Sequence, residues 1–267
     1  MNYMYLNKYF SKKKLVDSIF DDSLDVNIFV DELHRNYKVL DKEYRNEYFF
    51  KNTLFNKYVL GKYSLNTTTA LSEVVIGKSK ADFILLNREK GMVYEIKTDL
   101  DNLERLSYQL DDYYRVFSEV YVVTSEKNYY PVYKFIKDYK PNVGIIVLSD
   151  KVTLSIRKQA EIDNNNLNYD NLFKLLRKKE YEEILQFKFK SLPDVKPVQY
   201  FKVCLSWFKQ LDIKECQTLV FNQLRKRIES QNIGGILDIP MQIRWLVYSS
   251  NLTYKEFDKI HKKFNER

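Results

Sequence analysis

The spacing of hydrophobic residues changes along the chain and predicts which segments are helices and which are strands. A helix is predicted from about Asp41 to Leu60, where aromatic and aliphatic residues recur at helical spacing. Three strand-like apolar runs follow, at Leu71–Ile76, Ala81–Leu86 and Met92–Thr98. Turn-forming residues at 87–91 separate the last two runs, which therefore predict a β-hairpin.

The pattern returns to a helical period after Thr98 and then alternates. Leucines and aromatic residues between 100 and 117 form one stripe at helical spacing, which predicts a second helix. Short apolar runs at Val120–Thr124 and Val143–Leu148 are typical of buried strands, and a helix is predicted between them at Val132–Tyr139. The order helix, three strands, helix, strand, helix, strand predicts an α/β fold, with a mixed sheet and helices against its faces.

Strand signals stop at about residue 160, and an asparagine run at 164–166 is typical of a linker. Four helical patterns follow, at Leu172–Phe189, Tyr200–Leu211, Cys216–Glu229 and Met241–Phe264. We therefore predict two domains: an α/β domain with N-terminal helices over residues 1–160, and a helical domain over residues 161–267. This C-terminal helical lobe is a candidate surface for a protein partner.

Composition narrows the choice of partners and metals. The formal net charge of +8 favours polyanions such as nucleic acid, although a lysine-rich solvated surface explains the same charge. Two cysteines and two histidines are too few for a structural zinc site, so a bound metal would be a hard cation held by carboxylates. Few cysteines indicate a reducing compartment, and no apolar run is long enough to span a membrane. We therefore expect a cytoplasmic protein without membrane association.

Three charged residues occupy the predicted hairpin. Asp82 lies at the start of one strand, and Glu95 and Lys97 lie near the end of the next. If the turn is centred on residues 88–91, antiparallel pairing places Asp82 opposite Lys97 and Ile84 opposite Glu95. The three charged side chains would then share one face, whereas a one-residue slip would separate Asp82 from the others.

Charges within an otherwise apolar strand need compensation. Left unpaired they would be strongly destabilising, so Glu95 and Lys97 predict either a structural ion pair or a metal site. Phosphodiester hydrolysis needs an activated water and a neutralised developing charge, and a carboxylate-held Mg²⁺ ion provides both. A nearby lysine can orient the water. Asp82, Glu95 and Lys97 are therefore candidate catalytic residues.

Asp82, the Glu95-Ile96-Lys97 strand and the helix after it resemble the PD-(D/E)XK nuclease superfamily. Within it, the segment Tyr44–Thr124 is similar to an uncharacterised bacterial family first annotated from a Sorangium genome, and this similarity covers about a third of the chain. The resemblance implies a restriction-endonuclease-like αβββαβ core. It also implies that Asp82, Glu95 and the Ile96 carbonyl hold Mg²⁺ or Mn²⁺, with Lys97 beside the attacking water.

Further candidate residues flank this core. Glu73, on the first strand, either supplies another carboxylate to the metal or faces water at a sheet edge. Glu47 and Lys51 lie one turn apart on the first helix. They could approach the site, with Lys51 as a candidate substrate-binding residue, although an ordinary surface ion pair is the favoured interpretation.

Gln109 and Tyr113 match a Gln-x-x-x-Tyr motif of RecB-like exonucleases. Their spacing puts them on one helical face with Arg105, one turn earlier. This face could bind a phosphate or a terminal nucleotide, or it could be a solvated or partly buried polar face. Because the motif resembles that of DNA exonucleases, DNA is favoured over RNA as the substrate.

These observations together predict a Mg²⁺-dependent nuclease that hydrolyses DNA, in phage defence or in a mobile element. The alternative is a nucleic-acid-binding or protein-binding module on an inactive nuclease fold. Retention of the full set of Asp, Glu and Lys residues argues against this alternative.

Overall fold

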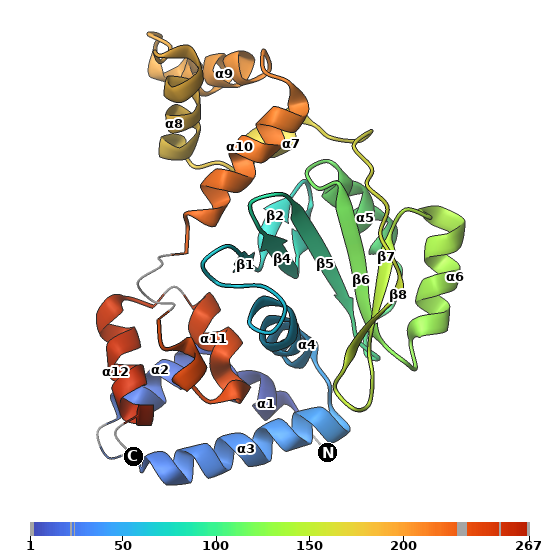
Figure 1. Ribbon diagram of the computed structural model, residues 1–267, viewed down its shortest axis with the longest axis vertical. Coiled ribbons are helices and arrows are strands. Elements are labelled where there is room, and N and C mark those ends of the chain that lie inside the picture. Colours follow the sequence, from blue (N-terminus) through green and yellow to red (C-terminus); the bar gives the residue numbers. More distant parts are fainter. Residues whose placement is uncertain (1–2, 22, 24, 229–233, 251, 266–267) are drawn as a thin grey trace.

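One mixed β-sheet lies at the centre of the chain (Figure 1). The computed structural model describes residues 3–21, 23, 25–228, 234–250 and 252–265. The sheet has six strands in the order β1-β4-β5-β6-β7-β8, in which β5, β6 and β7 are parallel neighbours and the other pairs are antiparallel. Its strands are β1 Thr69–Leu71, β4 Phe83–Leu86, β5 Gly91–Lys97, β6 Glu119–Ser125, β7 Gly144–Leu148 and β8 Leu154–Lys158. The predicted α/β fold with a mixed sheet is confirmed.

Two of the predicted strands are interrupted at acidic residues. The run 71–76 is divided into β1 and β2 (Val74–Ile76) near Glu73, whose φ of 59° lies in the left-handed region. The run 81–86 is divided at Asp82 into β3 (Ser79–Ala81) and β4. Because β2 and β3 pair with each other in a separate two-stranded sheet, Glu73 and Asp82 lie where the chain passes between the two sheets.

The hairpin of β4 and β5 forms in a register that differs from the predicted one by two residues. Phe83 pairs with Tyr94, so the turn is centred one residue earlier than predicted. The asparagine that follows β4 accepts two backbone N–H groups and sets the turn there. Continuing this register places Asp82 beside Glu95 rather than Lys97. Because the shift is even, Glu95 and Lys97 keep the face on which they were predicted to lie.

The helix predicted from residue 41 to residue 60 is in fact interrupted. α3 (Val26–Glu43) ends at its start, and α4 (Glu47–Leu54) begins after Asn46. The Asn46 side chain accepts a hydrogen bond from a backbone N–H of the first turn of α4 (3.1 Å). This cap places Glu47 at the first position of α4, where a carboxylate also complements the helix dipole.

The helix after β5 is shorter than the predicted stripe. Asp101 accepts hydrogen bonds from the backbone and side chain of the threonine that follows β5 (2.8 and 2.7 Å), and these bonds hold the connection as a turn. α5 (Leu106–Tyr114) begins only after it. Gln109 and Tyr113 lie within α5, and Arg105 immediately precedes it.

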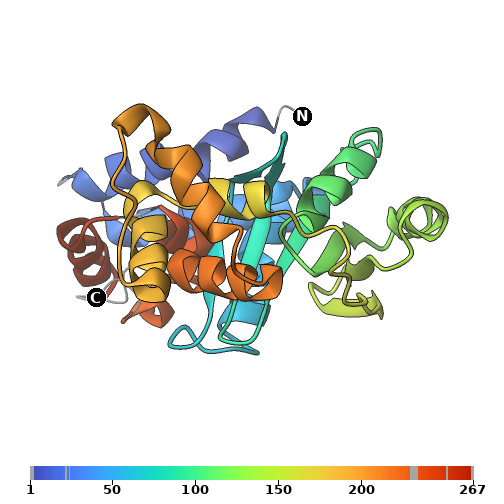
Figure 2. The ribbon, with the colours of Figure 1, turned by 90° about the horizontal axis from the view of Figure 1, so that it is seen from above.

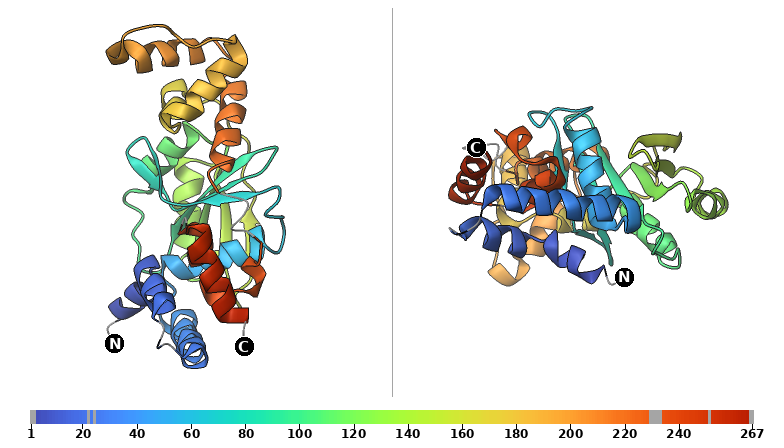
Figure 3. Two further views of the ribbon diagram at one scale, coloured as in Figure 1. Left: turned by 90° about the vertical axis from the view of Figure 1, so that its left-hand side faces the viewer. Right: turned by 90° about the horizontal axis from the view of Figure 1, so that it is seen from below.

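The remaining helices form two groups, and α6 stands apart from both (Figures 1 and 2). α7–α10 lie at one end of the molecule, whereas α1–α3, α11 and α12 lie together at the other, where both ends of the chain are found (Figures 1 and 3). Their bounds are α1 Met4–Tyr9, α2 Lys12–Phe20, α6 Tyr129–Tyr139, α7 Tyr169–Lys174, α8 Lys178–Phe189, α9 Pro197–Phe208, α10 Ile213–Arg225, α11 Arg244–Ser249 and α12 Tyr254–Asn265. The described residues also form the short π-helix η1 Phe55–Val59 and the 3-10 helices η3 Ile236–Asp238 and η4 Met241–Ile243.

Each face of the sheet packs against a different set of helices. Phe83 and Tyr94 belong to a core shared with α1–α4, α11 and α12. Ile84 and Val93, on the opposite face, belong to a core shared with α5–α10. The helices after residue 160 therefore contribute to both cores, and a separate helical domain over residues 161–267 stays a prediction.

The sequence also led us to expect reduced cysteines and no membrane-spanning segment. Cys204 and Cys216 are both buried free thiols. Within the described residues, no helix combines the length and the apolar composition that a membrane span requires.

Replacing Tyr248 by Phe is expected to destabilise the protein. The Tyr248 hydroxyl, on α11, accepts a hydrogen bond from the buried N–H of Ala70 on edge strand β1 (3.0 Å). Without the hydroxyl this N–H has lost its acceptor, which costs about 1–3 kcal/mol. Urea unfolding should show this loss, whereas Tyr254→Phe, at an exposed ring, should leave the free energy of unfolding unchanged. Equal stability of both variants would contradict the assigned bond.

Candidate active site

Asp82 ties the start of β4 to the end of β5. Its Oδ2 accepts a hydrogen bond from the backbone N–H of Ile96 (2.8 Å). The carboxylate is thereby held against the strand that carries Glu95 and Lys97. Metal binding by the Ile96 carbonyl, which the family resemblance implies, stays a prediction.

Three carboxylates from three separate elements converge here. One oxygen from each of Glu47, Glu73 and Asp82 lies within 4.8 Å of the others. Glu47 opens α4, Glu73 lies between β1 and β2, and Asp82 lies between β3 and β4. Carboxylate oxygens at such spacing are the ligands that Mg²⁺ and Mn²⁺ prefer. The donor set therefore fits a hard divalent cation.

Two lysines interact with these carboxylates. The buried Lys51 ammonium forms ion pairs with both Glu47 and Glu73, and Lys80 Nζ lies 2.8 Å from Glu73 Oε2. Burial alone would lower the pKa of Lys51, but the two carboxylates outweigh it and raise that pKa. Partial burial would raise the pKa of Glu73, but Lys51 and Lys80 outweigh this effect and lower that pKa. The ion pair expected between Glu47 and Lys51 is therefore present, although Lys51 is buried rather than on the surface, and substrate binding by Lys51 stays a prediction.

Glu95 and Lys97 form a second, more deeply buried pair. Their side chains are only 1% and 7% exposed, and Lys97 Nζ lies 2.7 Å from Glu95 Oε1. Lys97 Nζ also donates to Gln109 Oε1 (2.9 Å), and the Tyr113 hydroxyl donates to Glu95 Oε2 (2.5 Å). Burial raises the pKa of Glu95, against the opposing effects of Lys97 and the two hydrogen-bonding side chains from α5.

The two clusters meet at Asp82 and carry unequal charge. Together they contain four carboxylates and three ammonium groups: Glu47, Glu73, Asp82 and Glu95, with Lys51, Lys80 and Lys97. Burial, then the charges of Glu95 and Glu47, raise the pKa of Asp82 to about 8. The Ile96 N–H and Lys51 act in the opposite direction. Asp82 thus keeps a proton near neutral pH unless further positive charge enters the site.

The structure locates the residues of the Gln-x-x-x-Tyr motif behind the charged pair. Gln109 accepts a hydrogen bond from Lys97, and the fully buried Tyr113 donates one to Glu95. Contact of these two residues with a substrate stays a prediction. Arg105 is exposed at the start of α5, and among the described residues no hydrogen bond joins its guanidinium to the network. Arg105 is therefore the exposed member of the predicted substrate-binding face, and its contact with a substrate stays a prediction.

Glu47 is the site residue whose role the sequence did not reveal. Its only signal was the spacing of one helical turn from Lys51, which is equally typical of a surface ion pair. Only the approach of α4 to Glu73 and Asp82 gives Glu47 a second role.

A family model described as Bacteriophage P4 protein cII matches residues 41–234. This span is more than half of the 267 residues. The chain belongs to this family. In this P4 cII family member, the matched span contains every residue of the candidate site and excludes α11 and α12. Searches of the curated proteins and of the solved structures gave no match.

Asp82→Asn is expected to stabilise the metal-free protein at alkaline pH. The Asp82 pKa rises from about 3.9 in the unfolded chain to about 8 in the folded protein. The folded state therefore binds this proton more tightly, and the free energy of unfolding falls as pH rises between these values. An uncharged Asn avoids this loss and can still accept from Ile96.

Urea unfolding in EDTA measures the effect. At pH 8 the Asp82→Asn variant should exceed the parent by about 1–3 kcal/mol, and near pH 4 the two should be equal. Asp138→Asn, at an exposed carboxylate on α6, should show no difference at either pH. A parent that is the more stable protein at pH 8 would refute the assigned charge imbalance.

Proposed function

We propose that this protein is a Mg²⁺-dependent nuclease that hydrolyses the phosphodiester bonds of DNA, with Asp82, Glu95 and Lys97 at its catalytic centre. The observation that carries the proposal is the convergence of three carboxylates beside the buried Glu95–Lys97 pair. The resemblance to the PD-(D/E)XK superfamily supports it. So does the order of α4, the central-sheet strands β1, β4 and β5, α5 and β6, which accords with the αβββαβ core that the resemblance implies once the separate β2–β3 pair is set aside.

The metal ligands would come from the acidic cluster. Asp82, Glu73 and Glu47 offer oxygens at suitable spacing, and the resemblance adds Glu95 and the Ile96 carbonyl. When bound, Mg²⁺ or Mn²⁺ supplies a Lewis acid that polarises a phosphoryl oxygen and lowers the pKa of a coordinated water. Asp82 must lose its proton to bind the ion, so ion binding and deprotonation of Asp82 are coupled.

Lys97 is the group best placed to orient a water or steady a developing negative charge. Two of the three N–H bonds of its ammonium point at Glu95 and Gln109, which leaves one for a water or phosphate oxygen as far as the described residues show. Glu95 holds the Lys97 ammonium through the ion pair, and the Tyr113 hydroxyl donates to the other oxygen of Glu95. A preorganised ammonium in a water-poor site stabilises developing charge more strongly than one in solvent does.

One observation favours the alternative of a binding module on an inactive nuclease fold. Lys51 already pairs with Glu47 and Glu73, and Lys80 also pairs with Glu73, so two ammonium groups balance these two carboxylates without a metal. Assays of DNA cleavage and of thermal stabilisation by Mn²⁺ separate this alternative from the nuclease.

Cleavage of DNA should require both the metal and the named residues. Labelled circular, linear and single-stranded DNA, with RNA for comparison, are incubated with Mg²⁺ or Mn²⁺. We expect DNA cleavage that EDTA abolishes, and a loss of at least about 100-fold in Asp82→Asn, which removes a charged group from the reaction centre. The double variant Glu95→Gln/Lys97→Met should lose as much, and it avoids leaving one buried charge unpaired.

The matched control lies at the opposite end of β5. Lys90 and Glu119 also form a lysine–carboxylate pair with a buried acid, and Lys90→Met/Glu119→Gln should retain cleavage. Full activity in both site variants would exclude the assigned catalytic centre.

Binding of Mn²⁺ should raise the melting temperature. An ion at 100 times its dissociation constant adds about 2.7 kcal/mol to the free energy of unfolding. Glu47→Gln and Glu73→Gln should each weaken this shift in a titration, whereas Glu89→Gln, in the exposed hairpin turn, should not. A parent with neither a shift nor cleavage would favour the binding module.

A further inference from the structure

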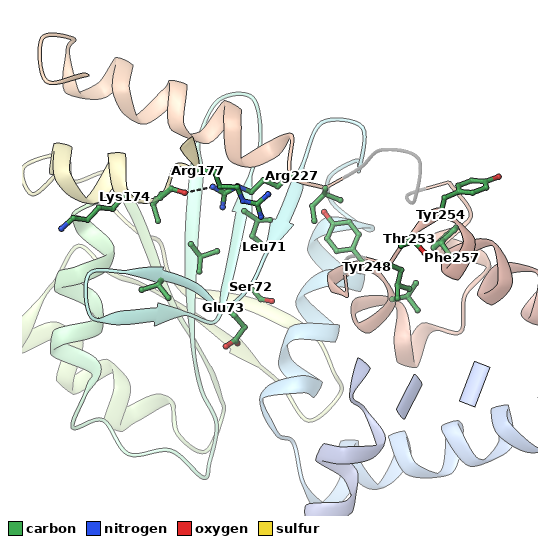
Figure 4. A pocket seen from close by; sticks show the side chains of 16 residues that line it. Leu71, Ser72, Glu73, Lys174, Arg177, Arg227, Tyr248, Thr253, Tyr254 and Phe257 are labelled. Carbon is green, nitrogen blue, oxygen red and sulfur yellow. Dashed lines mark hydrogen bonds between the residues drawn. The ribbon is translucent and has the colours of Figure 1, made fainter. Parts of the chain in front are cut away.

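A cavity of about 800 Å³ opens beside Glu73, between the two groups of helices (Figure 4). Residues 71–75 of β1 and β2 form its floor next to the acidic cluster. The other walls come from the end of α7, the α7–α8 connection and the segment after α10 on one side, and from α11, α12 and the residues just before α12 on the other. These walls include Lys174, Arg177, Arg227, Tyr248, Tyr254 and Phe257.

The wall facing α11 and α12 is basic. Lys174 ends α7 and Arg177 precedes α8, and both side chains are exposed. Arg227 bonds to both carboxylate oxygens of Glu180 and to the Leu175 carbonyl, so it holds α8 against the segment after α10. Among the lining residues that belong to the described part of the chain, Glu73 is the one acidic side chain. The basic wall therefore complements an anion that extends toward the site.

The opposite wall is aromatic. Tyr248 and Phe257 are nearly buried, so they form the wall itself, whereas the Tyr254 ring is 61% exposed. In Figure 4 the Tyr254 ring and the basic side chains lie on different sides of the cavity. A chain that alternates charged groups and planar rings could contact both walls together.

We infer that this cavity binds an extended single strand of nucleic acid and leads it to the acidic cluster; the inference rests on the proposed function. A basic groove that tracks the backbone, combined with an exposed ring for base stacking, is how proteins bind single strands without sequence preference. A cavity of this volume suits a segment of about two nucleotides. A duplex is bulkier than a single strand, since its major groove alone is about 12 Å wide, so we expect the cavity to admit a single strand in preference.

Fluorescence anisotropy with a 5′-labelled oligodeoxythymidine, in EDTA, tests this inference. Lys174→Gln/Arg177→Gln should weaken binding about tenfold, and should reduce the slope of log K against log salt by about 1.4 for two lost phosphate contacts. Tyr254→Ala should weaken binding about tenfold without changing that slope. The control, Lys134→Gln/Lys137→Gln on exposed positions of α6, removes the same charge elsewhere and should retain the parent affinity.

Competition defines the ligand, with thermal unfolding to confirm that every variant is folded. Unlabelled duplex that competes as well as single-stranded DNA would overturn the inference, and so would unchanged affinity in both cavity variants or an equal loss in the α6 control. If RNA competes equally, the cavity recognises a single strand through its phosphates and bases without regard to the sugar. If RNA competes weakly, the cavity recognises a DNA strand. Because EDTA prevents metal-dependent cleavage, cavity-dependent binding without any later cleavage would uphold this inference while refuting the nuclease.

Discussion

The burial of Glu95 and Lys97 constrains the structure around it. Every residue of β5 is buried, and the strand nevertheless carries two opposite charges. Removing one of them would leave an uncompensated charge in the core, which is among the most destabilising changes a protein can undergo. The pair is tolerated because α5 supplies Gln109 and Tyr113 as hydrogen-bonding partners. The buried charges of the candidate site are therefore stabilised only when α5 packs against β5.

A second constraint is the charge imbalance around Asp82. The carboxylates there exceed the ammonium groups by one, and burial, together with the nearby charges of Glu95 and Glu47, raises the pKa of Asp82. Excess negative charge in the folded protein lowers the free energy of unfolding, and such a loss of stability is common at functional sites. The left-handed backbone at Glu73 is a further local strain at the same place. Both features are compatible with the metal site proposed above.

The spacing of hydrophobic residues predicted which helices and strands are present better than it predicted where each begins and ends. The hairpin was recognised, yet its turn lay one residue away from the expected position, because one asparagine side chain bonding to the backbone decides the turn. The face of Glu95 and Lys97 survived this error, since side chains alternate with a period of two. Strand β8 was missed, because it is a partly exposed edge strand without a continuous apolar run. The interruptions at Glu73 and Asp82 were missed as well, because local propensity does not describe the passage between two sheets.

The sequence by itself determined the mixed α/β architecture, the strand carrying Glu95 and Lys97, and the proximity of Asp82 to that strand. These follow from short-range patterns, in which a few adjacent residues specify the structure. Only the tertiary structure decided that Glu47 joins Glu73 and Asp82, that Lys51 is buried between two carboxylates, and that α11 and α12 share a core with the N-terminal helices. These contacts join residues distant in the chain, and their free energy depends on burial and charge that no local pattern encodes.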